Sequence, residues 1–146
     1  PAGMVGGQAI DLGSVGVKLD QTALEYMHRH KTGALIEASV QLGALASGRA
    51  RPEDLHALNI YARAIGLAFQ VQDDILDVEG DTATLGKQSG ADAARDKPTY
   101  PSLMGLAAAK TYALELRDQA INALRPFDAA AEPLRELARY IVERRH

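Results

Sequence analysis

Apolar residues recur every three or four positions along most of this sequence, which is the spacing of an amphipathic helix. The first long run spans residues 20–47 and opens at Asp20, a residue type that often caps the start of a helix. The second run spans residues 52–78 and opens at Pro52, which suits a first helical turn. Gly80 is expected to end it, so the sequence predicts two long consecutive helices.

The rest of the chain continues the helical pattern, with one interruption. Residues 79–99 are rich in glycine and charge and have no sustained period, so they are expected to form a loop of about twenty residues. Two further helices are expected to open at Pro101 and at Pro133. Residues 1–12 resemble the tail of an element whose start is absent. Because no segment resembles a β-hairpin, the predicted fold class is an all-α helical bundle.

Composition narrows the function classes without choosing one. The chain has 146 residues, enough for a single domain with a substantial core, and 47% of them are hydrophobic. A formal net charge of -3 gives no general attraction to nucleic acid. The sequence contains no cysteine, which excludes disulfides and thiolate metal sites and fits a cytoplasmic protein. Charges or amides interrupt every long apolar stretch, so no membrane span is expected.

Three aspartates lie close together in the second predicted helix. Asp73 and Asp77 stand one turn apart on the same face, and Asp74 is a step around the helix. Like charges at this spacing repel one another, so a cation is expected to compensate them. Either Mg²⁺, which prefers oxygen ligands, or a network of lysines and arginines could do so. The residues alone also leave open a third possibility, that the aspartates are a solvated helix end.

Other polar residues are candidates for binding an anion. Lys31 and Thr32 lie within the first long helix beside the small Gly33, where a backbone or a ligand could come close. Lys87 and Lys97 lie in the predicted loop and could fold over an anion held near the aspartates.

Two more groups of polar residues have less distinctive patterns. Gln8 and Asp11 are three residues apart, so they would share a helical face. Gln70 precedes the aspartates within an apolar stretch. His28 and His30 are two residues apart, the wrong spacing for joint metal ligation from one helix, and are expected to be surface histidines. As isolated features, all of these residues are equally compatible with ordinary solvated or packing roles.

Four motifs together carry a resemblance to a known family. In order along the chain they are GGQAIDL, HRHKTGALIEASV, GLAFQVQDDILDVEGDTATLGKQSGAD and DKPTYPSL. The chain resembles the C-terminal half of a trans-isoprenyl diphosphate synthase, most closely the bacterial farnesyl diphosphate synthases or geranyltranstransferases. The resemblance implies a cytoplasmic, homodimeric, Mg²⁺-dependent transferase. Such an enzyme condenses an allylic diphosphate with isopentenyl diphosphate and releases diphosphate.

The resemblance also implies a role for each candidate residue. Asp73, Asp74 and Asp77 match the family's second aspartate-rich motif, in which the first aspartate binds Mg²⁺ directly. Lys31 and Lys87 match lysines that contact the allylic diphosphate, and Lys97 matches a lysine on the loop that closes over the site. Thr32 and Gln70 match residues that line the cavity near the developing carbocation. Gln8 and Asp11 match a polar pair on the helix leading into the site. The implied catalytic residues are Lys31, Thr32, Gln70 and Asp73.

The sequence departs from the family in one respect. No second DDxxD appears in residues 1–146. The family's first such motif and its isopentenyl diphosphate site would lie upstream of Pro1. Residues 1–146 are therefore expected to be part of one polyprenyl synthase domain, inactive without its N-terminal half. A non-catalytic helical subunit with the same fold, or a helical interaction module, is the alternative function.

Overall fold

The computed structural model describes residues 3–14, 19–84 and 99–144. These ranges hold helices and no strand, as expected for an all-α fold. The helical elements in chain order are α1 (Met4–Gly13), α2 (Gln21–His28), the π-helix η1 (Arg29–Gly33), α3 (Ala34–Ala46), α4 (Pro52–Thr84), α5 (Tyr100–Met104), α6 (Leu106–Ala123), the 3₁₀ turn η2 (Ala129–Ala131) and α7 (Glu132–Glu143).

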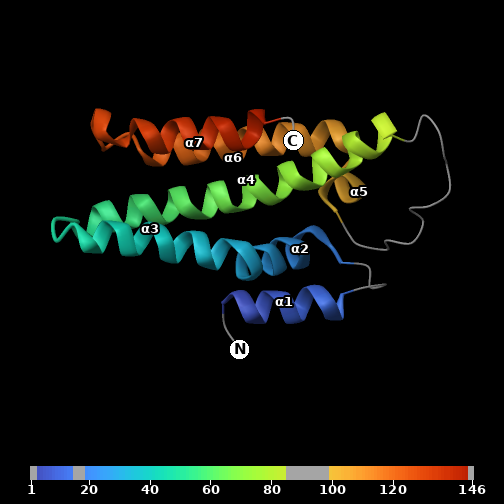
Figure 1. Cartoon of the computed structure of the whole chain (residues 1–146), viewed down its shortest axis with the longest axis horizontal. Helices are drawn as coiled ribbons and strands as arrows, with labels where there is room; N and C mark the ends of the chain where they lie inside the picture. Colours follow the sequence, from blue (N-terminus) through green and yellow to red (C-terminus); the bar gives the residue numbers. More distant parts are fainter. Residues whose placement is uncertain (1–2, 15–18, 85–98, 145–146) are drawn as a thin grey trace.

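The helices stack in layers around α4 (Figure 1). α2, η1 and α3 form one continuous rod that runs antiparallel to α4, and α1 lies against η1 on the outer side of this rod. α6 and α7 cover the other side of α4, where the contact between α4 and α6 is the most extensive in the described chain. The aspartates of α4 therefore lie on a helix enclosed between two layers.

The central position of α4 explains its unusually broad apolar surface. Tyr61, Ile65, Val71 and Ile75 are all buried, although together they face more than one neighbouring helix. A helix with partners on only one side buries a single stripe, whereas a central helix must be apolar over most of its circumference. Large side chains from several helices complete the core around α4: Leu24, Tyr100, Leu116 and Leu124.

The helix predicted over residues 20–47 forms, with a local change of geometry that the pattern did not reveal. Asp20 caps it as expected, because its side chain accepts a hydrogen bond from the Ala23 backbone N–H at 2.8 Å. The run then widens into the π-helix Arg29–Gly33 and returns to α-helix. Such π segments are short and occur often at functional sites. Five residues are too few to disturb a 3.6-residue apolar period, which is why the sequence predicted one uniform helix.

The prediction that Gly80 ends the second helix is wrong, because α4 continues to Thr84. The loop expected over residues 79–99 is therefore wrong for residues 79–84, and residues 85–98 lie outside the described residues. A glycine ends a helix by adopting positive φ, and Gly80 does not adopt it. Glycine inside a helix costs about 1 kcal/mol relative to alanine. The ion pair from Lys110 of α6 to Glu79 helps to offset that cost.

The helix expected to open at Pro101 is divided in two. Thr99 caps α5 through a reciprocal pair of bonds with Ser102, and α5 ends after Met104. Gly105 has φ +86° and lies between α5 and α6. This left-handed conformation favours glycine and interrupts the helical direction. By contrast, the last helix begins with Pro133 in its first turn, as predicted.

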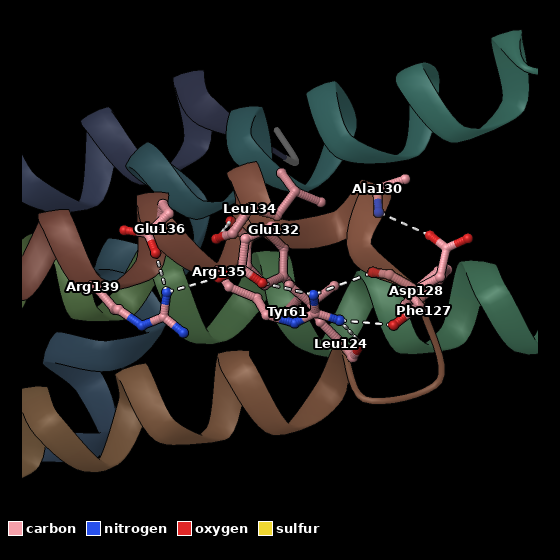
Figure 2. Close-up of polar contacts among 10 residues, drawn as sticks. All are labelled: Tyr61, Leu124, Phe127, Asp128, Ala130, Glu132, Leu134, Arg135, Glu136 and Arg139. Carbon is pink, nitrogen blue, oxygen red and sulfur yellow. Dashed lines mark hydrogen bonds and ion pairs between the residues drawn. The ribbon is translucent and has the colours of Figure 1, made fainter.

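The turn between α6 and α7 is organised by one arginine (Figure 2). Arg135 donates through Nη2 to the carbonyl oxygens of Leu124 and Phe127, both at 2.8 Å, and through Nη1 to that of Asp128 at 3.2 Å. These carbonyls follow the end of α6, where backbone acceptors lack helical partners. Tyr61 of α4 adds a bond from its hydroxyl to the Leu134 carbonyl at 2.8 Å, which ties α7 to the central helix.

One surface of the described chain is markedly apolar. Leu35, Leu42 and Leu45 of α3 are 57 to 67% exposed, and α3 buries none of its residues. Their spacing places them on one face of the helix. No helix in the described ranges is long and apolar enough to cross a membrane.

Candidate functional site

The three aspartates of α4 lie in different environments. Asp77 is exposed, whereas the Asp73 side chain is 40% exposed and forms an ion pair with Arg144, which follows the end of α7. Asp74 is partly buried, and its Oδ2 accepts a hydrogen bond at 2.9 Å from the backbone N–H of Tyr100, the first residue of α5. One helix turn therefore presents an exposed carboxylate, a partly exposed one paired with an arginine, and one bound by the backbone of α5.

Electrostatics reinforce this difference. The pKa of Asp74 is raised to about 6, mainly by burial and also by the neighbouring charges of Asp77 and Asp73, while the Tyr100 N–H and Lys31 act in the opposite direction. The repulsion among the aspartates that the sequence predicted is therefore present in the folded structure. Lys31 belongs to η1, and η1 packs against the central helix.

The carboxylates of α4 fit a magnesium ion in number and chemical type. In the described ranges no group of three or more histidine, aspartate or glutamate side chains converges as a metal cage. Mg²⁺ in phosphate-transfer sites is typically held by only one or two carboxylates, with water and phosphate oxygens completing its shell. Asp73 and Asp77, one turn apart and open to solvent, provide such a pair. Asp74 would act from behind them.

Lys31 lies on η1, which packs against α4, and is paired with a carboxylate from α1. Its Nζ is 2.7 Å from Oδ2 of Asp11, and the two side chains are 31% and 10% exposed. The structure thus joins Lys31 to the helix that carries Asp11. Gln8 lies on the same helix but is exposed, so the structure does not bring it to Lys31 with Asp11.

Close backbone packing places Thr32 and Lys31 near α4. Thr32 is partly buried in η1, next to the buried Gly33. A Cβ added to Gly66 of α4 would lie 3.3 Å from the Gly33 Cα. The expectation that Gly33 allows another backbone to come close is therefore confirmed, and that backbone belongs to α4.

The expectation that His28 is a surface residue is wrong. His28 is 8% exposed, and its Nδ1 lies 2.7 Å from Oε1 of Gln70, which is also 8% exposed. Burial lowers the pKa of His28. The burial of His28 could have been predicted from the sequence, because Leu24, Met27 and His28 recur at the spacing of one buried helix face.

A second buried polar atom lies close to His28. The rings of His28 and Tyr100 are stacked with centroids 5.7 Å apart. His28 Nε2 and the Tyr100 hydroxyl are both buried, and neither has a hydrogen-bond partner among the described residues. Tyr100 thus contacts both the aspartate motif and the buried histidine. Its backbone N–H donates to Asp74, and its ring packs on His28, which is hydrogen-bonded to Gln70.

The structure pairs Lys31 with Asp11 and places the three aspartates and Gln70 on α4. Lys87 and Lys97 lie outside the described residues, so their predicted place above the site stays a prediction. Arg144 and Tyr100 were not selected from the sequence. Both contact the aspartates of α4 from segments far away in the sequence: Arg144 pairs with Asp73, and the Tyr100 N–H donates to Asp74.

Comparison with known proteins places this arrangement in a family. Residues 2–136 match the polyprenyl synthetase family. The chain is 53% identical to the farnesyl diphosphate synthase of Escherichia coli K12, with 98% of this chain and 49% of that protein aligned. The chain spans about half the length of the curated relatives it matches.

Solved structures agree with the sequence match. An FPP/GFPP synthase from Zymomonas mobilis superposes with a TM-score of 0.81 at 42% identity, over 95% of this chain and 45% of that one. A Helicobacter pylori geranyltransferase complexed with magnesium and isoprenyl diphosphate superposes with a TM-score of 0.73 at 36% identity, over 96% of this chain and 46% of that one. The aspartates of α4, the lysine of η1 and the all-helical layers thus occur in a chain that belongs to the polyprenyl synthetase family.

Proposed function

We propose that this chain supplies one half of the active site of a Mg²⁺-dependent prenyltransferase, which joins an allylic diphosphate to isopentenyl diphosphate and releases diphosphate. The observation that carries the proposal is the placement of Asp73 and Asp77 on α4, which packs directly against η1, the helix that carries Lys31. A site for a metal-bound diphosphate needs carboxylates for the metal and a cation for the phosphate oxygens, and these two helices provide both.

The relatives support the class of reaction and favour a particular product. The Escherichia coli relative is named as a farnesyl diphosphate synthase, and the Helicobacter pylori structure contains magnesium and isoprenyl diphosphate. We therefore propose farnesyl diphosphate as the product. We also propose that residues 1–146 form part of one synthase domain whose other half provides the isopentenyl diphosphate site. The matched relatives, about twice as long as this chain, support that division.

Each residue has a defined part in the proposed reaction. Asp73 and Asp77 would hold Mg²⁺, and Asp74, fixed by the Tyr100 N–H, would act on it through water. When bound, Mg²⁺ supplies positive charge that stabilises the leaving diphosphate. Lys31 would exchange its bond to Asp11 for one to a phosphate oxygen, a role that suits a flexible ammonium group.

The residues next to the leaving group are neutral, which suits a carbocation. Thr32 and Gln70 can orient oxygen atoms toward positive charge without the negative charge that would trap the cation. His28 fixes Gln70 from behind, and burial lowers the pKa of this histidine, which favours its neutral form. The apolar core around α4 keeps out water, which would otherwise quench the allylic cation.

The proposal extends to the residues for which the structure gives no placement. Lys87 would contact the allylic diphosphate and Lys97 would belong to the loop that closes over it. Gln8 would act from α1, where it is exposed. A homodimer is proposed as the assembly, because Leu35, Leu42 and Leu45 leave an apolar face of α3 exposed. The cytoplasmic location stays a prediction.

Replacement of Asp73 tests the proposal. In the complete enzyme, Asp73→Ala should lower turnover of an allylic diphosphate with isopentenyl diphosphate by several orders of magnitude, because a metal ion that stabilises the leaving group is lost. Asp118→Ala is the matched control, since Asp118 is an exposed aspartate of α6 that pairs with Arg117. Turnover of the Asp73 variant close to that of the control at saturating Mg²⁺ would contradict the metal role and favour a non-catalytic subunit.

A further inference from the structure

Arg144 is attached to the aspartate-bearing helix by three different interactions. Its guanidinium forms an ion pair with Asp73 through Nη2, and its Cζ lies 4.5 Å from the centroid of the Phe69 ring. Gln72 donates through Nε2 to the Arg144 carbonyl oxygen at 3.2 Å. Phe69, Gln72 and Asp73 lie within one and a quarter turns of α4, so the residue after α7 is docked on the start of the aspartate motif.

The backbone at the end of α7 directs the side chain toward α4. Arg144 leaves the helix with φ -61° and ψ 147°, and its N–H still donates to the Tyr140 carbonyl at 2.9 Å. Its side chain is only 16% exposed, whereas that of Asp73 is 40% exposed. The cation is therefore more enclosed than the anion, and Asp73 remains accessible from solvent on the side that Arg144 does not cover.

From these contacts we propose that Arg144 is an internal counter-ion that occupies Asp73 in the metal-free protein and that a divalent cation must displace. The inference rests on the proposed role of Asp73 as a metal ligand. A guanidinium and a divalent cation on one carboxylate repel each other, so the two compete. Arg144 acts here as a positioning residue, because it acts on the metal only through Asp73.

A groove next to Arg144 would receive its side chain after displacement from Asp73. The groove has a volume of about 270 Å³ and is lined by Ile75, Leu114 and Val142 together with the polar Gln72, Glu79, Lys110 and Glu143. An arginine can place its methylene groups on apolar side chains while its charged end faces a carboxylate. Lys110 is already paired with Glu79, so Glu143 is the carboxylate that the displaced Arg144 side chain would face in this groove.

The competing interpretation predicts the opposite effect on metal affinity. If Arg144 only oriented Asp73 for the metal, removal of the guanidinium would loosen the carboxylate and weaken metal binding. If Arg144 is a counter-ion that must leave, its removal strengthens metal binding. The sign of the change therefore decides between the two roles.

Direct measurement of Mn²⁺ binding by the purified chain, using electron paramagnetic resonance of the free ion, tests the inference. Arg144→Gln should bind Mn²⁺ about three- to ten-fold more tightly than the unmodified chain, the size expected when a partly exposed ion pair no longer competes. Arg144→Lys should fall between the two, because it keeps the charge but loses the planar group that faces Phe69. Arg139→Gln is the charge-matched control, since Arg139 pairs with Glu132 and Glu136 of its own helix, and it should change the affinity less than two-fold.

The outcomes separate this inference from the function on which it rests. Binding that is abolished by Asp73→Asn and tightened by Arg144→Gln supports both. Binding that is abolished by Asp73→Asn but unchanged or weakened by Arg144→Gln overturns the counter-ion role and leaves the metal role intact. No binding by any form at millimolar Mn²⁺, or binding that Asp73→Asn does not alter, overturns both.

Discussion

Gly7 of α1 lies so close to Lys31 of η1 that a Cβ added to Gly7 would be 2.1 Å from the Lys31 backbone nitrogen. No side chain fits at that distance, so the absence of a Cβ allows the two backbones to touch. The same contact brings Asp11, one turn further along α1, within 2.7 Å of the Lys31 ammonium group. Packing of two helices thus sets the position of a lysine that we assign to the diphosphate.

Gly7→Ala should lower the free energy of unfolding by about 3 kcal/mol, because the clash is with backbone and can be relieved only by moving α1. Urea unfolding followed by circular dichroism measures this change. Gly43→Ala is the matched control, since Gly43 lies in α3 and a Cβ there meets nothing within 4 Å. The control should be more stable by about 0.5–1 kcal/mol. Equal effects of the two substitutions would show that α1 does not require contact at Gly7.

Arg135→Ala should lower the free energy of unfolding by about 2 kcal/mol, because three backbone carbonyls beyond the end of α6 lose a charged donor (Figure 2). Arg139→Ala provides the comparison, since Arg139 bonds only to the exposed carboxylates of Glu132 and Glu136, and it should cost less than about 0.5 kcal/mol. Thermal and urea unfolding both report the difference. If the two arginines proved equivalent, the turn would be held by packing alone.

The helical elements were predictable from the sequence because each depends on local features. Asp20 caps its helix, and Pro133 lies in the first turn of α7, as expected. The errors occurred where glycine had two possible conformations. Gly80 continues a helix and Gly105 interrupts one, and the choice depends on what the neighbouring segments contact, which single-sequence patterns do not contain.

The candidate site was predictable in part for a related reason. Asp73 and Asp77 share a face because of their spacing, and that relationship holds for any straight helix. The partners of these residues come from far along the chain. Arg144 reaches Asp73 across 71 residues, and His28 reaches Gln70 across 42. Neither pairing produces a sequence pattern, so only the resemblance to a family placed Gln70 in the site beforehand.

The contribution of His28 to the stability of the chain should be lost as the pH drops below 6.5. Burial lowers the folded-state pKa of His28 below the unfolded value of 6.5, so the unfolded state takes up a proton first. The stabilisation is therefore complete above pH 6.5 and is lost as the pH falls toward the folded-state pKa. Asp74, whose pKa is raised to about 6, acts in the opposite direction between pH 6 and 4.

His28→Gln isolates the histidine contribution, because glutamine keeps a donor for Gln70 but has no charge to gain. We expect the unmodified chain to lose more stability than this variant between pH 7 and 5, measured as the difference in urea midpoints at each pH. His56→Gln, at an exposed position of α4, should follow the unmodified chain. Parallel pH profiles for the unmodified chain and His28→Gln would mean that His28 titrates normally and is not buried in solution.

The exposed leucines of α3 should make this chain self-associate. Leu35, Leu42 and Leu45 share one helix face and are each more than half exposed, which is more apolar surface than a monomer usually leaves open. Sedimentation velocity should therefore show species heavier than one chain, increasing with concentration. Leu42→Glu should shift the distribution toward the monomer, because association would bury its charge.

Leu137→Glu is the control, since Leu137 is 43% exposed on α7, on the other side of α4 (Figure 1), and should leave the distribution unchanged. A concentration-independent monomer in the unmodified chain would rule out α3 as an association surface, and the proposed homodimer would then have to use another face.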